Sequence, residues 1–158
     1  MPKILIIYQS RTGNTAAMAE SVEEGVRKAG VEVVRKKIEN TSVDDLLEPE
    51  GIIIGSPTYF AATTAEVKRL IDDSIKHYKN LEGKVGAAFV SAGGLGGGGE
   101  TAILDILRAF LVHGMIVPGF VGHYGPLSIG SPDEDRKKVC VEFGSKVAGI
   151  VKKLNPNL

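Results

Sequence analysis

The amino-acid sequence predicts a doubly wound α/β fold, in which a five-stranded parallel sheet carries helices on both faces. Apolar runs of strand length alternate with stretches of helical periodicity along the whole chain. Two of the runs carry the marks of sheet edges, which favours the strand order 2-1-3-4-5. No internal repeat or linker interrupts the 158 residues, so we expect a single domain over residues 1–158.

Each strand is predicted from a short apolar run, and the five runs are residues 3–8, 31–38, 51–56, 84–92 and 115–122. The second run contains three consecutive cationic residues, Arg35 to Lys37, which are typical of an edge strand. The fifth contains Pro118, which lacks the N–H that a central strand must donate. These two strands are therefore placed at the two edges of the sheet.

Helices are predicted wherever apolar residues recur every three or four positions. The first follows residue 15 and stops at Gly30, with acidic residues early and basic residues late, as the helix dipole favours. A short helix is expected over Val43–Leu47. The spacing of Thr63 and Glu66 fits a capping box at the start of the next helix. Two more helices are predicted around residues 103–111 and 139–154, and Cys140 lies along the last as a small apolar group.

The composition excludes several classes of function. Nineteen Lys and Arg residues balance nineteen Asp and Glu residues, so no basic surface argues for a nucleic acid or an anionic membrane. The longest apolar stretch is too short to span a bilayer, and the first residues lack the features of a signal peptide. A single cysteine and the lack of clustered metal ligands predict no disulfide and no metal site. A cytoplasmic protein is expected.

Ligands of such sheets bind beyond the carboxyl ends of the strands, where the winding direction reverses. In this chain the loops at that position are SRTGNT (10–15), SPTYFAAT (56–63) and SAGGLGGGGE (91–100). These loops stand out by their hydroxyl, aromatic and glycine residues, and the predicted fold places them side by side. This convergence predicts a binding site formed by all three.

The first loop is rich in hydroxyl groups and opens directly into a helix. Free N–H groups at a helix start, the side chains of Ser10, Thr12, Asn14 and Thr15, and the flexible Gly13 would together suit a phosphate. The alternative is that Asn14 or Thr15 simply caps the helix. Arg11 either pairs with the phosphate or points to solvent, and solvent is slightly favoured.

The other two loops offer aromatic and glycine surfaces. Tyr59 and Phe60 follow Pro57 and either pack on a planar ring or cover the end of the sheet. Gly94, Gly96 and Gly99 match G-x-G-x-x-G, but this pattern follows the fourth strand instead of the first, so a dinucleotide fingerprint is disfavoured. The glycines instead permit a flat backbone wall with free N–H groups close to a ligand.

SRTGNT resembles the phosphate signature of flavodoxins, and the whole chain resembles a flavodoxin-like FMN-binding protein. The segments SPTYF, GGGGET, HGMIVPG and YGPLSIGSPDEDRKKV are similar to those of the WrbA-type NAD(P)H:quinone oxidoreductases. This resemblance implies FMN as cofactor, NAD(P)H as electron donor and a quinone as acceptor. It implies the phosphate on Ser10, Arg11, Thr12, Gly13, Asn14 and Thr15. The flavin ring would lie against Pro57, Thr58, Tyr59 and Phe60, with backbone donors from Ser91, Ala92, Gly93, Gly94, Leu95 and Gly96. His113 would lie beside the quinone and assist protonation, although the alternative is a histidine at a helix C-terminus.

Two roles share this cofactor: a two-electron NAD(P)H:quinone (or flavin) reductase, and a carrier that passes single electrons between redox proteins. Carrier flavodoxins resemble one another in an acidic surface and a flexible glycine beside the ring. This chain is neutral, and its 59–62 stretch has no glycine, so a positive φ is costly there. Both features favour the enzyme. The chain has little room for the insertions that build the tetramer of the WrbA-type family, so a homo-oligomer stays open.

Overall fold

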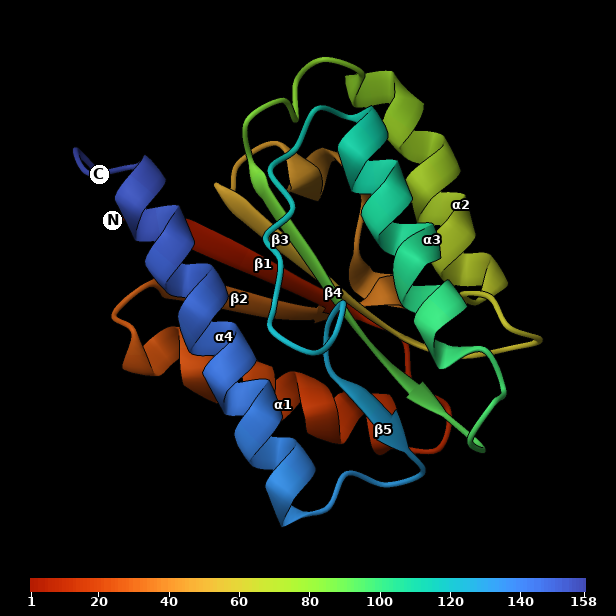
Figure 1. The fold of residues 1–158 in the computed structure, drawn as a ribbon. Coiled ribbons are helices and arrows are strands. Elements are labelled where there is room, and N and C mark those ends of the chain that lie inside the picture. Colours follow the sequence, from red (N-terminus) through yellow and green to blue (C-terminus); the bar gives the residue numbers. More distant parts are fainter.

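The computed structural model describes residues 1–158 and confirms the predicted α/β architecture (Figure 1). Five parallel strands form one sheet in the predicted order β2-β1-β3-β4-β5. The elements in chain order are β1 (Lys3–Tyr8), α1 (Asn14–Lys28), β2 (Glu32–Lys37), β3 (Gly51–Pro57), α2 (Ala65–Asp73), β4 (Val85–Ala92), α3 (Gly99–Val112), β5 (Leu127–Ile129) and α4 (Glu134–Leu154). Short 3₁₀ turns occupy Ile38–Asn40, Val43–Leu46 and Ser74–His77.

Helices cover the sheet on both faces, with α1 and α4 on one and α2 and α3 on the other (Figure 1). Successive side chains of β1 alternate between two separate cores, as the pleat of a strand requires. Ile4 and Ile6 pack with α1 and α4, whereas Leu5 and Ile7 pack with α2 and α3. A central strand buried on both sides explains why the sequence of β1 reads as a continuous apolar run.

The fifth strand lies later in the chain than predicted. In residues 115–122 only Ile116 pairs with the sheet through its backbone, at the start of β4, and the chain then leaves the edge at Val117 and Pro118. It returns at Pro126, which accepts a hydrogen bond from the Val90 N–H, and β5 follows directly. The prediction of a strand over 115–122 is wrong because the residue without an N–H interrupts the pairing.

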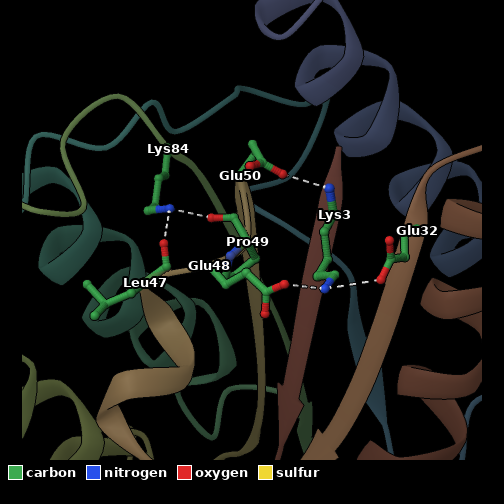
Figure 2. Close-up of polar contacts among 7 residues, drawn as sticks. All are labelled: Lys3, Glu32, Leu47, Glu48, Pro49, Glu50 and Lys84. Atoms are coloured by element: carbon green, nitrogen blue, oxygen red, sulfur yellow. Dashed lines mark hydrogen bonds and ion pairs between the residues drawn. The ribbon is translucent and has the colours of Figure 1, made fainter. Parts of the chain in front are cut away.

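The amino ends of the strands lie at one edge of the sheet, and Figure 2 shows how polar groups close that edge. The Lys3 ammonium donates to Glu48 at 2.6 Å and lies 3.1 Å from Glu32, while the Lys3 N–H donates to Glu50 at 2.7 Å. The carboxylates of Glu48 and Glu32 raise the pKa of the Lys3 ammonium above its ordinary value. The edge is therefore closed by the chain's own charges.

Lys84 closes the neighbouring part of this edge, just before β4. Its ammonium donates to the backbone carbonyls of Leu47 and Pro49 at 2.8 Å and 2.5 Å (Figure 2). Burial lowers the pKa of Lys84 below its ordinary value. The opposite edge, at the carboxyl ends of the strands, carries the three loops that the sequence singles out. None of the helices is long and apolar enough to cross a membrane.

Candidate functional site

The first loop forms a crook between β1 and α1 that has unused hydrogen-bond donors. Ser10 Oγ accepts from the N–H groups of Gly13 and Ala16 at 3.1 Å and 3.2 Å. Gly13 has a φ of 94°, and neither Asn14 nor Thr15 caps the helix with its side chain. Four N–H groups have no acceptor in the chain, those of Arg11, Thr12, Asn14 and Thr15. A row of free donors at the positive end of a helix dipole suits a phosphate.

The Arg11 side chain turns away from the crook toward the second loop. Its guanidinium lies 4.9 Å from the centre of the Tyr59 ring and 3.4 Å from a Glu66 carboxylate oxygen. Sixty per cent of the side chain is exposed, in line with the preference for solvent. Arg11 therefore borders the site without occupying the phosphate position.

Ser91, at the end of β4, joins the three loops. Its hydroxyl lies 2.8 Å from that of Thr15, and its carbonyl accepts from the Thr58 N–H at 2.8 Å. Thr15 and Ser91 are both buried, so water competes little for their contact. The crook, the second loop and the glycine-rich loop are thus held in one arrangement.

The second loop forms a tight reverse turn over Tyr59–Ala62. The end residues exchange two backbone hydrogen bonds, at 2.9 Å and 3.1 Å, and the central residues Phe60 and Ala61 have φ values of 50° and 62°. The absence of glycine predicted the opposite, because a left-handed conformation costs a non-glycine residue roughly 1–2 kcal/mol. The chain adopts this conformation at two consecutive residues, so surrounding contacts must compensate for the cost.

The start of α2, which follows this turn, differs from the predicted capping box by one residue. Thr64 is the N-cap, and its hydroxyl accepts from the Val67 N–H at 3.3 Å. Thr63 instead donates its N–H to Asp105 of α3 at 3.3 Å. The predicted capping box at Thr63 and Glu66 is therefore wrong, because the hydroxyl that accepts a helical N–H belongs to Thr64.

The glycine-rich loop serves two purposes. The N–H groups of Gly93, Gly94, Leu95 and Gly96 have no acceptor in the chain, and a side chain added at any of these three glycines would meet no atom within 4 Å. This matches the predicted flat wall, whereas Ser91 and Ala92 belong to β4 itself. Gly98 has a different role: an added Cβ would lie 2.3 Å from that of Ala61. Its lack of a side chain lets the second loop pack against it.

Together the loops enclose a cleft of about 220 Å³ that is lined by Arg11, Thr12, Asn14, Thr15, Pro57, Thr58, Tyr59, Ser91, Ala92 and Gly93. All of these residues were predicted from the sequence. Ser10 and Gly13 lie behind it in the crook, and Phe60, Gly94, Leu95 and Gly96 are exposed on the loops beside it. A larger hollow of about 630 Å³ adjoins Ser10 and Arg11 on the side of α2.

The residues of the cleft fit FMN. Free N–H groups in the crook suit its phosphate, and the glycine wall beside Tyr59 leaves space for a flat ring with polar edges. Thr58 supplies an independent observation, because its Oγ1 is buried with no hydrogen-bond partner in the chain. Buried hydroxyl groups are seldom left unpaired, so a bound molecule that supplies the partner would explain it. No group of three or more potential metal ligands is present.

His113 does not join this cleft. It follows the last residue of α3, a helix that starts at the cleft and runs about 20 Å back toward the amino edge (Figure 1). Its Nε2 lies 2.7 Å from Ser74 Oγ, and its Nδ1 is buried without a partner. Burial lowers the pKa of His113 below its ordinary value. The predicted place beside a quinone in the cleft of the same chain is therefore wrong, and the alternative of a histidine at a helix C-terminus describes its position.

The sequence predicts His77 and His123 as surface residues. His77 is instead buried, with its Nε2 2.7 Å from Asp44, so that prediction is wrong. His123 is exposed, as predicted, and stacks on Phe120. Cys140 is fully buried in α4, where burial raises the pKa of its thiol to about 12. Thr101, which the sequence did not single out, donates its hydroxyl to the Ala61 carbonyl at 2.6 Å.

Comparisons with known proteins show the family of the chain. Residues 35–122 match a family model described as NADPH-dependent FMN reductase. A flavodoxin of Aquifex aeolicus (strain VF5) is 38% identical over 159 residues, covering 94% of this chain and 86% of the relative. An NAD(P)H dehydrogenase (quinone) of Archaeoglobus fulgidus is 34% identical and covers 98% of this chain and 100% of the relative.

Solved structures show the same fold. The structure of a flavodoxin from the domain Archaea has a TM-score of 0.81 and 30% identity, covering 95% of this chain and 99% of the other. A WrbA-like flavodoxin structure from Agrobacterium tumefaciens has a TM-score of 0.86, covering 97% of this chain and 99% of the other, at 23% identity. The similarity covers nearly the whole chain in both cases.

Proposed function

Because the chain belongs to the family of NADPH-dependent FMN reductases, we propose that it is an FMN-dependent oxidoreductase that transfers two electrons from NAD(P)H to a small-molecule quinone. The observation that carries this proposal is the convergence of three loops at Ser91 around free N–H groups and the unpaired hydroxyl of Thr58. FMN would supply the redox chemistry, and the protein would bind and orient it.

Different residues of the cleft would bind the phosphate and the ring of FMN. The N–H groups of Arg11, Thr12, Asn14 and Thr15 would hold the phosphate together with the Thr12 hydroxyl. The glycine wall and Thr58 would donate to the polar edges of the ring. Tyr59 lines the cleft and offers an aromatic surface, with the fully exposed Phe60 next to it. No histidine, carboxylate or lysine lines the cleft, so the protons of quinone reduction would come from solvent or from the Tyr59 phenol.

A one-electron carrier is the second candidate, and the flavodoxins among the relatives favour it. The balanced formal charge of the chain argues for the enzyme, because carriers use charge to speed docking to redox partners. The strained turn at Phe60 and Ala61 is compatible with both roles. We propose the reductase as the main function and a redox-protein partner as the alternative.

Anaerobic titration of the FMN-loaded protein with NADH and with NADPH tests the proposal. A reductase bleaches the flavin absorbance promptly in one two-electron phase, and added benzoquinone restores it. A carrier shows no reaction with either pyridine nucleotide, and dithionite reduces it in two separate one-electron phases. The second result contradicts the enzyme and supports the carrier.

We also propose that the protein acts in the cytoplasm, because its single cysteine is buried and no disulfide is needed for the fold. Two copies could pair through the apolar residues exposed at the rim, Phe60 and Leu95, which are 105% and 93% exposed. Light scattering at several protein concentrations, with and without FMN, tests for such a homo-oligomer. A mass of one chain under all conditions contradicts it.

A further inference from the structure

The connection between β2 and β3 lacks the helix that usually packs on the sheet between two parallel strands. It contains only the short 3₁₀ turns Ile38–Asn40 and Val43–Leu46. A hollow of about 630 Å³ remains between this connection, α2 and the end of β1. Ligand sites in proteins have volumes of roughly 300–1,000 Å³, so the hollow is large enough for a small organic molecule.

Gln9 places an unused polar group at this hollow. Leu5 and Ile7 face the core beside α2 and α3, and the alternation of a strand puts Gln9 on the same side, beyond the apolar core. Its N–H continues the sheet by donating to the Gly55 carbonyl at 3.0 Å. The residue is only 7% exposed, and its Oε1 is buried with no hydrogen-bond partner in the chain. Buried polar groups are seldom left unpaired, so a ligand that donates to Gln9 would explain this one, as at Thr58.

The other groups around the hollow favour a nucleoside that carries phosphate. Ile38 and Leu70 are buried apolar residues in its wall, which suits the face of a planar base. The carboxylates of Glu39 and Asp73 accept hydrogen bonds and suit the hydroxyl groups of a ribose. The Arg69 guanidinium makes no ion pair in the chain and has N–H donors in the fork geometry that matches phosphate oxygens.

Arg11 connects the hollow with the cleft, because it is the one residue that lines both. Its N–H is one of the free donors of the crook, and its guanidinium lies 3.4 Å from Glu66, which also lines the hollow. A phosphate in the crook is thus separated from the hollow by a single residue. A diphosphate that begins in the crook would extend across this border, past two guanidinium groups.

We propose that the hollow is a subsite for the adenosine group of a dinucleotide whose diphosphate passes Arg11. This inference rests on the assignment of the crook to a phosphate in the proposed function. Two redox dinucleotides carry adenosine: FAD, which is FMN joined to AMP, and NAD(P)H, the proposed electron donor. In either case Gln9 accepts a hydrogen bond from the nucleoside, and Arg69 binds the phosphate next to it.

Adenosine itself is the first probe, because it has no phosphate and does not depend on the crook. Added to the cofactor-free protein, it should shift the amide NMR signals of residues 38–43 and 66–73 in a saturable way. Gln9→Met keeps the length of the side chain but removes the amide, and should weaken this binding about tenfold. Urea denaturation checks that the variant is folded. A lack of shifts in these two segments, or equal binding by Gln9→Met, overturns the proposal, whether or not the protein binds FMN.

The second experiment identifies the dinucleotide. If it is FAD, then FAD should bind the cofactor-free protein about tenfold more tightly than FMN, and Arg69→Gln should remove this difference. If it is NAD(P)H, then FAD and FMN should bind alike, and Arg69→Gln should raise the KM for NAD(P)H about tenfold in the FMN-loaded protein at an unchanged kcat. Lys68→Gln removes the neighbouring exposed cation, which does not line the hollow, and should match the wild type in both measurements. An Arg69→Gln variant that matches the wild type in both measurements overturns the proposal.

Discussion

The two edges of the sheet are built from the same strands but treat their polar groups in opposite ways. At the amino edge, Lys3 and Lys84 take up three carboxylates and two backbone carbonyls within the chain (Figure 2). At the carboxyl edge, the N–H groups of residues 11, 12, 14 and 15 and of residues 93–96 have no acceptor. The amino edge satisfies its polar groups within the chain, whereas the carboxyl edge keeps N–H donors that a ligand can use.

This difference teaches how a binding site can be recognised without a ligand. Glycine and hydroxyl residues occur in many loops, but a loop whose donors lack acceptors marks the place where an anion is missing. Flexible side chains at the amino edge reach back and satisfy the backbone, as the Lys84 ammonium does. Short side chains and glycines at the carboxyl edge leave the backbone accessible.

The largest effect is expected from a negative charge in the crook. Thr12→Glu places a carboxylate among the donors assigned to the phosphate, and like charges in contact cost several kcal/mol. FMN affinity should fall by about 100-fold or more, measured by fluorescence titration of the cofactor-free protein, while the urea midpoint changes little. Asn80→Glu makes the same change of charge on an exposed residue near the amino edge and should leave the affinity unaltered. Equal losses in both variants would contradict a local phosphate site.

The second prediction concerns the amino edge. Lys84→Met removes the donor of two backbone carbonyls and should lower the free energy of unfolding by roughly 1–3 kcal/mol. Because the cleft lies at the other edge, the affinity for FMN should stay the same. Urea denaturation and fluorescence titration measure the two quantities, with the exposed Lys153→Met as the matched control. A loss of FMN affinity with unchanged stability would show that the two edges are not independent.

Thr58→Val separates stability from binding within the cleft. The buried Oγ1 of Thr58 has no partner, so a methyl group in its place should leave the cofactor-free protein as stable or raise its stability by about 1 kcal/mol. If FMN supplies the partner, its affinity should fall about fivefold to tenfold. Thermal unfolding without cofactor and titration with FMN give the two values. A destabilised variant with normal affinity would mean that the hydroxyl serves the fold and not the ligand.

The sequence was sufficient to predict the order of the strands and which loops line the cleft, because both follow from local patterns. Continuous apolar runs specify buried parallel strands, and Gly13 among hydroxyl residues specifies an anion crook. The sequence was insufficient where two distant segments decide the conformation. Ala61 adopts a positive φ because Gly98 and Thr101 lie against it, and no pattern in residues 59–62 contains that information.

The same limit explains the errors in the second half of the chain. Ile116 and Pro126 both pair with β4, but nine residues lie between them in sequence. Gly125 also passes so close to the Ala88 carbonyl that an added Cβ would lie 2.0 Å from its oxygen. The position of His113 follows from the length of α3, because His113 directly follows the last residue of that helix. A helix that begins at the carboxyl edge ends near the amino edge, so the topology alone would have excluded this residue from the cleft.

The smallest effect is expected at His113, which belongs to the amino edge. Ser74 Oγ lies 2.5 Å from the Ile71 carbonyl and donates to it, so His113 Nε2 carries the hydrogen that Ser74 Oγ accepts. Protonation would then add a hydrogen at the buried Nδ1, where no acceptor exists, and burial accordingly lowers the pKa of His113 below 6.5. Between that lowered value and 6.5 the unfolded chain binds a proton that the folded chain does not, so acidification through this range reduces stability. Urea midpoints measured from pH 8 to pH 5 should decline more steeply for the wild type than for His113→Gln, and the activity with NAD(P)H should be equal in both. Parallel pH profiles of stability in the two proteins would contradict a neutral ring with its hydrogen on Nε2. A large loss of activity in His113→Gln would instead show that His113 contributes to the cleft of a second copy of the chain.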